Sequence, residues 1–320
     1  MTAPQNLSFA VLGTGALGGF YGGLLARSGH EVHFLVRSDY DYIKQHGLQV
    51  DTPLGDFHLN TVNVYSRPEE MPPVDCVLVC WKSTVELASP QTLAQALNQL
   101  CRQGNSFALV LQNGLDVEST AANILGAKRV MGGCCFLCSN KIGPGHIQHL
   151  DYGRIAFGEY SMDFRGQVTE RMKTVSSAFE SAQIPNTPAQ DLRTARWKKL
   201  VWNIPFNGLS VALQADTRQL LNDPHTTYLV EALMGEVQHA ASMCGIHVED
   251  EHVQRMLTDT RAMVPYDSSM LLDFRAGRPI EVEAIFGNPL RAALAAGFTP
   301  TRIEMLYQQL CFLDRQNLSS

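Results

Sequence analysis

The fold class of this chain is decided by the stretch Phe9-Ala10-Val11-Leu12-Gly13-Thr14-Gly15-Ala16-Leu17-Gly18. Its apolar first half has the length of a buried parallel strand, and the residues after Gly18 have the periodicity of a helix. In the G-x-G-x-x-G turn between them, Gly13 permits a tight turn, Gly15 lets a pyrophosphate approach the backbone, and Gly18 lets the helix pack on the strand. The stretch therefore predicts a dinucleotide site. The cofactor contacts expected from this turn are Gly13, Thr14, Gly15, Ala16, Leu17 and Gly18.

The second predicted strand indicates which dinucleotide binds. Residues 31–36 are followed by Arg37 and Ser38, at the place where an NAD enzyme usually carries Asp or Glu. An acid would accept hydrogen bonds from the ribose 2′-hydroxyl and repel a 2′-phosphate, whereas Arg37 can pair with that phosphate and stack on adenine. We therefore predict NADP(H) as the cofactor. The alternative is that Arg37 is a solvated residue that closes a strand.

The composition limits the class of protein. The chain has 320 residues, 45% of them hydrophobic and 18% charged, which is ordinary for a globular protein with two domains. A net charge of −6 argues against a nucleic-acid partner, because binding phosphates requires a basic face. Since we find neither a signal-like N-terminus nor an apolar run long enough to span a membrane, we expect a cytoplasmic protein with small-molecule partners.

The cysteines do not indicate a metal site. Cys134, Cys135 and Cys138 form C-C-x-x-C, but no second cysteine pair follows at the spacing of a zinc site. We therefore expect no metal, and we expect most of the cysteines to be small buried hydrophobes.

Two further strands are predicted at 75–80 and 107–111, each a short apolar run. Lys82 follows the first strand, and Asn113 follows the second. Because ligands bind outside the carboxyl ends of the strands in an open parallel sheet, we expect the glycine turn, Arg37, Lys82 and Asn113 to converge on one crevice.

The remaining elements of the first half are less informative about function. Helices are predicted near 40–46 and 90–102, and a hairpin is predicted from 48–50 and 57–64. A strand pair is predicted at 145–150 and 152–157, where His146 and His149 occupy polar positions of the alternation. Both histidines are expected to be surface residues.

The pattern changes in the second half of the chain, where helical periodicity replaces short apolar runs. Residues 183–188 contain two prolines and no helical period, which is typical of a boundary. The sequence thus predicts an α/β protein with a Rossmann-type domain over 1–187, followed by an all-α domain over 188–320.

One predicted helix of the second half carries a polar stripe. Residues 196–207 are apolar on nearly every side, yet Lys199, Asn203 and Asn207 follow one another at intervals of four. Buried amides and an ammonium are costly unless they are paired, so this stripe should face a hydrogen-bonding network or a polar ligand. Pro205 is expected to bend the helix near the end of the stripe.

A second polar cluster spans 267–283, where two predicted helices meet at a Gly-Arg-Pro break. From composition alone, Ser268 or Ser269 would be an N-cap, and Glu281 would be a favourable acid in the first turn after Pro279.

These motifs together resemble the ketopantoate reductase family, also called 2-dehydropantoate 2-reductases, over almost the whole chain. The motifs that carry the resemblance, in order, are Gly13–Gly18, Lys82, Gln112-Asn113-Gly114, Trp197-Lys198-Lys199-Leu200 with Asn203 and Asn207, Ser268-Ser269-Met270-Leu271, Arg278-Pro279-Ile280-Glu281 and Gly297-Phe298-Thr299-Pro300. The resemblance implies NADPH-dependent reduction of a 2-oxo acid to a 2-hydroxy acid, in the family case ketopantoate to (R)-pantoate on the route to pantothenate.

The resemblance also implies roles for single residues. Lys199 matches the family's catalytic lysine, and an ammonium there could stabilise and then protonate the oxygen that becomes negative during hydride transfer. Glu281 matches the acid expected to orient that lysine near the nicotinamide ribose. The other matched positions are the substrate contacts Asn113, Asn203, Asn207 and Ser269 and the cofactor contacts Arg37, Lys82, Asn113 and Cys138.

Several residues depart from the family pattern, namely Asp116, Thr217 and the Tyr266-Asp267 pair. An added carboxylate near an anionic substrate would repel it unless it is paired, so another acid could be the substrate. The nearest alternative is a related dehydrogenase acting on another 2-oxo, 3-hydroxy or imino acid. An alternative of another class is a non-catalytic NADP(H)-sensing protein. The apolar helical half could also carry the interface of a homodimer.

Overall fold

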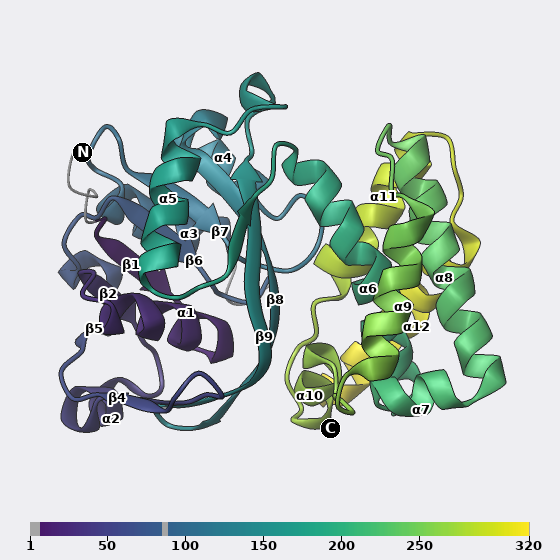
Figure 1. Ribbon diagram of the computed structural model, residues 1–320, viewed down its shortest axis with the longest axis horizontal. Coiled ribbons are helices and arrows are strands. Elements are labelled where there is room, and N and C mark those ends of the chain that lie inside the picture. Colours follow the sequence, from purple (N-terminus) through teal and green to yellow (C-terminus); the bar gives the residue numbers. More distant parts are fainter. Residues whose placement is uncertain (1–6, 85–88, 320) are drawn as a thin grey trace. The chain divides into compact units, whose positions relative to one another are not determined.

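The computed structural model describes residues 7–84 and 89–319. The chain divides into two compact units. The sheet unit comprises Met1–Gln112 and Val117–Leu192, and the helical unit comprises Asn113–Asp116 and Arg193–Ser320. A four-residue segment of the first half of the chain therefore packs with the helices of the second half. Figure 1 shows the sheet unit in purple to teal and most of the helical unit in green to yellow.

The sheet unit is built on one ten-stranded sheet. Its strands are β1 (Phe9–Leu12), β2 (Val32–Leu35), β3 (Leu48–Asp51), β4 (Phe57–Leu59), β5 (Asn63–Tyr65), β6 (Cys76–Val79), β7 (Phe107–Val110), β8 (Val130–Gly143), β9 (His146–Glu159) and β10 (Asn186–Pro188).

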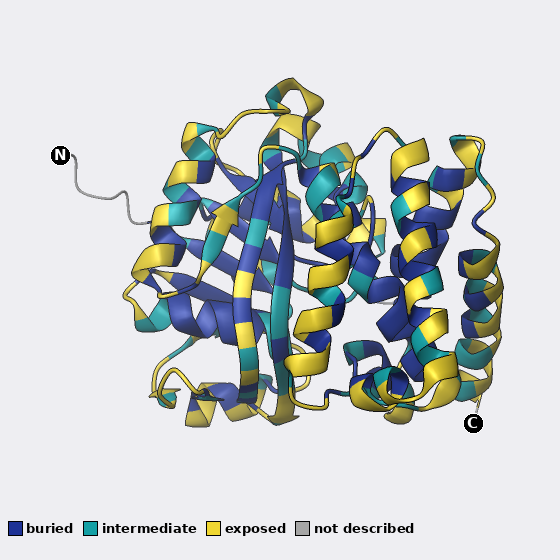
Figure 2. Ribbon diagram, turned by 45° about the vertical axis from the view of Figure 1, so that its right-hand side comes forward, coloured by how far each residue is buried: buried dark blue, intermediate teal, exposed yellow. Residues whose placement is uncertain are grey.

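Six strands form the parallel core of this sheet, in the order β5-β2-β1-β6-β7-β8. This is the strand order of a Rossmann-type domain, which confirms the predicted fold class. The strands β1, β2, β6 and β7 are buried at every residue because helices cover both faces, and they are dark blue in Figure 2.

Helices pack on the two faces and enclose two hydrophobic cores, one containing Phe20 and Phe157 and the other containing Leu97 and Val110. The helices of this unit are α1 (Ala16–Arg27), α2 (Tyr40–His46), α3 (Pro90–Leu100), α4 (Ser119–Leu125) and α5 (Glu170–Ser181), with short 3₁₀ turns η1 (Pro68–Glu70), η2 (Ala127–Arg129) and η3 (Met162–Phe164).

The long hairpin β8–β9 corrects the prediction of two strands at 145–150 and 152–157. Residues 146–157 belong to one strand, β9, and Tyr152, with a φ of 64°, lies at a shift in the register with β8. The predicted hairpin of 48–50 and 57–64 is also shorter than expected. It ends at Leu59, and residues 63–65 form β5, which pairs with β2 instead.

The expectation that His149 is a surface residue is wrong. Its side chain is buried, Nδ1 lies 2.8 Å from Thr52 Oγ1, and its ring lies 4.2 Å from that of Phe20 on α1. His146 is half-buried, and its Nε2 lies 2.7 Å from Asp51 Oδ2. Alternation along the strand therefore failed to indicate burial, because α1 and β3 pack against this end of β9.

The helical unit encloses its own hydrophobic core, which includes Trp197, Ile204 and Phe286. Its central helix α6 continues past Pro205 to Leu213. Across residues 7–84 and 89–319, no helix combines the length and apolarity needed to cross a membrane. The elements are α6 (Leu192–Leu213), α7 (Thr217–Asn222), α8 (Pro224–Met243), α9 (Asp250–Ala262), α10 (Ser269–Arg275), the π-helical turn η4 (Glu283–Gly287), α11 (Asn288–Ala295) and α12 (Thr301–Ser319).

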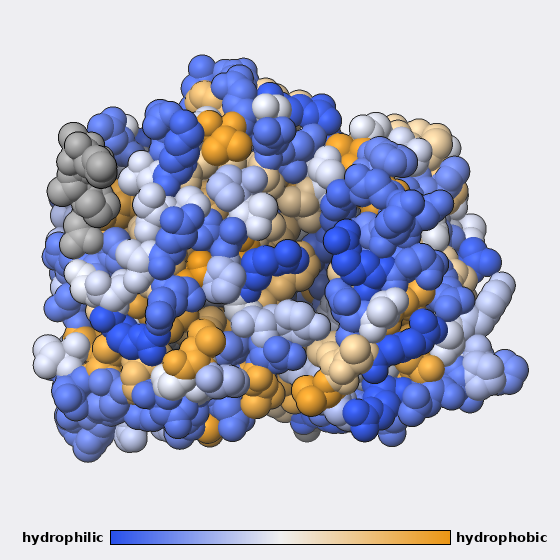
Figure 3. Space-filling view, viewed as in Figure 1, coloured by the Kyte–Doolittle hydropathy of each residue, from blue (hydrophilic) through white to orange (hydrophobic). Residues whose placement is uncertain are grey.

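Hydrophilic side chains cover most of the face drawn in Figure 3, and hydrophobic ones are scattered among them in small groups. Such scattering is ordinary for a globular surface, because single exposed apolar side chains are common. This face therefore does not by itself identify a binding site.

Candidate functional site

The glycine turn between β1 and α1 has the geometry that its sequence predicts. Gly13 has a φ of 102°, and a Cβ atom there would lie 2.7 Å from the Trp81 side chain. A Cβ on Gly18 would lie 2.1 Å from the Gly13 carbonyl oxygen, so only glycine lets α1 approach the strand this closely. At Gly15 a Cβ would meet no atom within 4 Å. The backbone of the turn is therefore open to a ligand at Gly15.

The start of α1 has the properties of an anion site. Gly15 is the N-cap and offers no side chain to the first N–H groups, and no acid lies in the first turn. Uncapped N–H groups and the helix dipole favour a phosphate. Thr14 Oγ1 donates to the Leu35 carbonyl at 3.2 Å, which joins the turn to the end of β2. These residues fit the pyrophosphate of a dinucleotide.

Arg37 lies just beyond β2, and its side chain is exposed. Among the described residues, no acid forms an ion pair with it. The nearby carboxylate of Asp39 is buried and accepts from Lys141 Nζ at 2.6 Å and from the Gly145 N–H at 3.0 Å. Burial opposes ionisation of Asp39, but the hydrogen bonds from Lys141, Gly145 and Ser38 outweigh it and lower its pKa. Asp39 is thus occupied elsewhere, and Arg37 is the residue that suits a 2′-phosphate.

The other predicted cofactor contacts of the sheet unit lie on neighbouring elements. The turn, Arg37 and Lys82 follow β1, β2 and β6, which are adjacent parallel strands, so they share one edge of the sheet. Cys138 lies on β8, and the hydroxyl of the next residue, Ser139, donates to the Ala16 carbonyl at 3.4 Å. Burial raises the pKa of the Cys138 thiol to about 12, so this side chain is neutral at physiological pH.

Asn113 differs from these residues because it belongs to the helical unit. Lys199 Nζ donates to Asn113 Oδ1 at 2.7 Å. The lysine lies on α6 and is 8% exposed, so this bond compensates part of the cost of burying an ammonium. Two predicted site residues that are 86 positions apart in the chain are therefore in direct contact.

The polar stripe of α6 is buried, as predicted. Lys199, Asn203 and Asn207 are 8%, 4% and 2% exposed. Asn207 Oδ1 is a buried acceptor with no hydrogen-bond partner among the described residues. A buried polar atom without a partner is costly, so this oxygen is suited to accept a hydrogen bond from a ligand.

The stripe extends one turn beyond the sequence prediction, to Ser210. Its hydroxyl lies 2.6 Å from that of Ser268, which caps α10 by accepting from the Leu271 N–H at 3.1 Å. The prediction of an N-cap at Ser268 or Ser269 is confirmed at Ser268, and Ser269 is the half-buried first residue of α10. The spacing of three residues after Asn207 is the signal that could have identified Ser210.

Glu281 is buried and directly precedes the helical segment that begins at Val282. Its neighbours Ile280 and Val282 belong to the same hydrophobic core as Leu200, the residue after Lys199. The charge of Arg278 is paired, because its guanidinium forms an ion pair with the buried Asp273 carboxylate at 2.9 Å.

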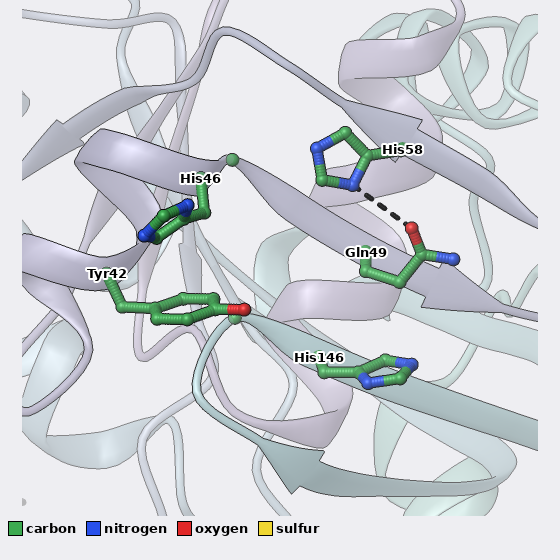
Figure 4. A pocket seen from close by; sticks show the side chains of 7 residues that line it. Tyr42, His46, Gln49, His58 and His146 are labelled. Carbon is green, nitrogen blue, oxygen red and sulfur yellow. Dashed lines mark hydrogen bonds between the residues drawn. The ribbon is translucent and has the colours of Figure 1, made fainter.

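A separate cavity of about 240 Å³ opens on the sheet unit among α2, β3, β4 and the β8–β9 hairpin (Figure 4). Its lining residues are Tyr42, His46, Gly47, Gln49, His58, Gly145 and His146. His58 Nδ1 donates to Gln49 Oε1 at 3.0 Å, and the rings of Tyr42 and His46 are 4.7 Å apart. Within residues 7–84 and 89–319, no three His, Cys, Asp or Glu side chains are placed to hold a metal ion. None of the predicted site residues lines this cavity.

A Rossmann-type domain with an open G-x-G-x-x-G turn defines the class of dinucleotide-dependent oxidoreductases. Comparison with known proteins identifies the family within this class. The model "Ketopantoate reductase PanE/ApbA" matches residues 9–162, and "Ketopantoate reductase PanE/ApbA C terminal" matches residues 191–313. The chain therefore belongs to the ketopantoate reductase family, whose enzymes use NADPH, and the resemblance seen in the sequence is confirmed.

Individual relatives are similar over nearly their full length. The chain is 47% identical over 310 residues to a 2-dehydropantoate 2-reductase from Nostoc sp., covering 97% of this chain and 96% of that protein. The crystal structure of 2-dehydropantoate 2-reductase from Geobacter metallireducens has a TM-score of 0.90 at 40% identity, covering 96% and 99% of the two chains. A D-mandelate dehydrogenase solved with NADH and anilino(oxo)acetate has a TM-score of 0.85 at 17% identity, covering 97% and 99%, and thus shares the fold.

Proposed function

We propose that this protein reduces ketopantoate to (R)-pantoate with NADPH. The observation that carries the proposal is the hydrogen bond of 2.7 Å from the buried Lys199 ammonium to Asn113. Membership of the ketopantoate reductase family and 47% identity to a 2-dehydropantoate 2-reductase support the same substrate.

The two units have separate tasks in this proposal. The sheet unit holds NADPH through the turn Gly13–Gly18, with Arg37, Lys82 and Cys138 as further contacts. When bound, the cofactor supplies a hydride to the keto carbon of the substrate. The helical unit binds the 2-oxo acid through Asn113, Asn203, Asn207 and Ser269.

Lys199 is the proposed acid of the reaction. Its ammonium donates a hydrogen bond to the keto oxygen, stabilises the negative charge that develops there, and transfers a proton to give the 2-hydroxy acid. Asn113 holds the ammonium in place through its side-chain oxygen. We assign to Glu281 the task of orienting Lys199 and contacting the cofactor. Its burial supports this role, as does the hydrophobic core that its neighbours Ile280 and Val282 share with Leu200 of α6.

The unpartnered oxygen of Asn207 supports a substrate that carries a hydroxyl group. Ketopantoate has one at C4, and its O–H can donate to Asn207 Oδ1. The analogue 3,3-dimethyl-2-oxobutanoate has the same carbon skeleton without this hydroxyl. It would leave the buried acceptor unpaired, which is the situation in which a site discriminates most strongly.

The experiment compares kcat/KM for ketopantoate and for 3,3-dimethyl-2-oxobutanoate in the wild type and in Asn207→Leu. We expect the wild type to prefer ketopantoate by on the order of 10⁴–10⁵-fold. The variant should lose most of this preference through slower ketopantoate turnover. An equal preference in both proteins would refute the role of Asn207. A wild type that binds NADPH and reduces neither acid would refute the enzyme assignment in favour of a sensing protein.

Three further assignments belong to the proposal. A division into domains over 1–187 and 188–320 is supported by the change of packing that follows Leu192, five residues after the proposed boundary. A cytoplasmic location is supported by eight free cysteines, which suit a reducing compartment.

A homodimer through the helical unit is supported by Met305 and Phe312 of α12. Both side chains are exposed, and because they lie seven positions apart they share one face of the helix. Light scattering after size exclusion tests the dimer, which a mass near 35.3 kDa would exclude.

A further inference from the structure

The π-helical turn η4 has a feature that the proposed reaction does not explain by itself. In an α-helix the Asn288 N–H would bond to the Ala284 carbonyl four residues earlier. Here it bonds to the Glu283 carbonyl, five residues earlier. The Ala284 carbonyl is thereby released from the helix, and it accepts from the Leu115 N–H at 2.9 Å.

The other backbone group of Leu115 is held from the same turn. Asn288 Nδ2 donates to the Leu115 carbonyl oxygen at 2.7 Å. The amide of Asn288 is itself oriented, because Arg291 donates to its Oδ1 at 2.6 Å and also to Glu283 Oε2 at 2.9 Å. The N–H and the carbonyl of the buried Leu115 are thus both hydrogen-bonded, one to Ala284 of η4 and the other to Asn288, which directly follows η4.

Gly114 allows this close approach. It has a φ of 106°, and a Cβ there would lie 2.3 Å from the Ala284 carbonyl oxygen. The residue before it is Asn113, which is only half-buried and whose Oδ1 accepts from Lys199. Burial alone therefore does not fix Asn113, whereas the backbone two residues further on is fixed at both its N–H and its carbonyl.

We propose that η4 and Asn288 form a clamp on Leu115 that positions Asn113 against Lys199, so that Asn288 is a positioning residue for the reaction. This inference rests on the proposed function, because it assigns Asn113 and Lys199 to the reaction centre. π-Turns inside helices are frequent at functional sites, and this one follows two residues after Glu281, a proposed site residue. It therefore ties the loop that carries Asn113 to the helix that Glu281 precedes.

The test is a double-mutant cycle with Asn288→Asp and Asn113→Ala. Asn288→Asp keeps the shape of the side chain and the acceptor for Arg291 but removes the donor to Leu115. We expect kcat/KM for ketopantoate to fall about 10- to 100-fold, since a misplacement of about 1 Å costs on the order of 10²-fold, while the Kd for NADPH stays within threefold. In the Asn113→Ala background the same change should have little further effect, because the clamp acts through Asn113. The proposal would be overturned if the losses of kcat/KM from the two single variants multiply in the double variant, or if Asn288→Asp keeps the wild-type kcat/KM.

The matched control is Gln238→Ala. Gln238 Nε2 also donates to a backbone carbonyl of the helical unit, that of Val248 at 2.9 Å, and in addition to Asp250 Oδ1 at 2.6 Å, so its removal costs at least as many hydrogen bonds as Asn288→Asp. We expect near wild-type kcat/KM from this variant, and a loss equal to that of Asn288→Asp would contradict a specific role.

Amide hydrogen exchange tests the clamp independently of the proposed function. Asn288→Ala is a second variant for this measurement in case Asn288→Asp folds poorly. We expect faster exchange at residues 113–116 in either folded variant than in the wild type, because Leu115 loses part of its clamp. Unchanged exchange would overturn the clamp even if the wild type reduces ketopantoate. Faster exchange in a protein that does not reduce ketopantoate would support the clamp and refute the proposed function.

Discussion

Replacing Lys199 by methionine should stop the reaction without unfolding the protein. Methionine is unbranched and apolar, so it can occupy the buried path of the lysine side chain on α6. Its cost to stability includes the lost donor to Asn113 Oδ1, a contribution that we put at about 1 kcal/mol because Asn113 is half-buried and water can replace the donor. The removed ammonium no longer needs to be desolvated, which offsets part of this cost.

The kinetic effect should be much larger. Loss of an acid that both stabilises the oxyanion and transfers a proton costs on the order of 10²–10⁴-fold in kcat. The assay is steady-state NADPH oxidation with ketopantoate, together with a fluorescence titration for the Kd of NADPH. This Kd should change less than threefold because Lys199 is not among the proposed cofactor contacts, most of which lie on the sheet unit.

Lys198→Met is the matched control for this variant. Lys198 is the preceding residue of the same helix, its side chain is 31% exposed, and it pairs with Glu249 at 2.7 Å. The same change of charge at this position should leave kcat within threefold of the wild type. A kcat of Lys199→Met within tenfold of the wild type, or an equal loss in Lys198→Met, would refute the role of Lys199.

Three further predictions concern the sheet unit. Arg37→Asp should weaken NADPH binding about 10- to 100-fold through loss of a charge-assisted contact and improve NADH binding, and an unchanged ratio of the two Kd values would contradict the 2′-phosphate assignment. Gly15→Ala should fold normally, because its Cβ meets no atom within 4 Å, but it should bind NADPH more weakly. Gly18→Ala should lower both the affinity for NADPH and the free energy of unfolding, because its Cβ would lie 2.1 Å from the Gly13 carbonyl oxygen. If the two glycine variants are equally stable in chemical denaturation, the packing argument fails. Burial raises the pKa of Cys138 to about 12, so the thiolate, which is the reactive form, appears only as the pH rises toward that value. Alkylation of Cys138 at pH 8 should therefore be far slower in the folded protein than after unfolding. Equal alkylation rates mapped by mass spectrometry would show that the thiol is not buried.

The parts of the fold that could be predicted are those in which local pattern and global packing agree. The stretch Phe9–Gly18 contains both its strand and its turn, and short apolar runs mark β6 and β7 because both faces of a parallel sheet are covered. The stripe Lys199–Asn203–Asn207 could be predicted because polar residues are unexpected in an apolar helix. Each of these signals lies within about a dozen residues of sequence.

The parts that could not be predicted depend on contacts between distant residues. Tyr152 adopts a positive φ in the middle of β9, which a search for alternating residues interprets as a break between strands. His149 occupies a polar position of that strand but lies beneath Phe20 of α1. Asn113 follows β7 and is therefore expected at the ligand-binding edge of the sheet. The segment 113–116 packs instead with residues about 170 positions later, as the hydrogen bond from Asn288 to Leu115 shows at a separation of 173. The π-turn has no periodic signal, since its residues are compatible with an ordinary helix.

The most direct test of the central claim is the initial rate of NADPH oxidation by the purified protein with ketopantoate, measured beside pyruvate and 2-oxoisovalerate. We predict rapid turnover with ketopantoate and much slower turnover with the two acids that lack a hydroxyl for Asn207. Binding of NADPH without reduction of ketopantoate, or a clear preference for either of the other acids, would contradict the assigned substrate.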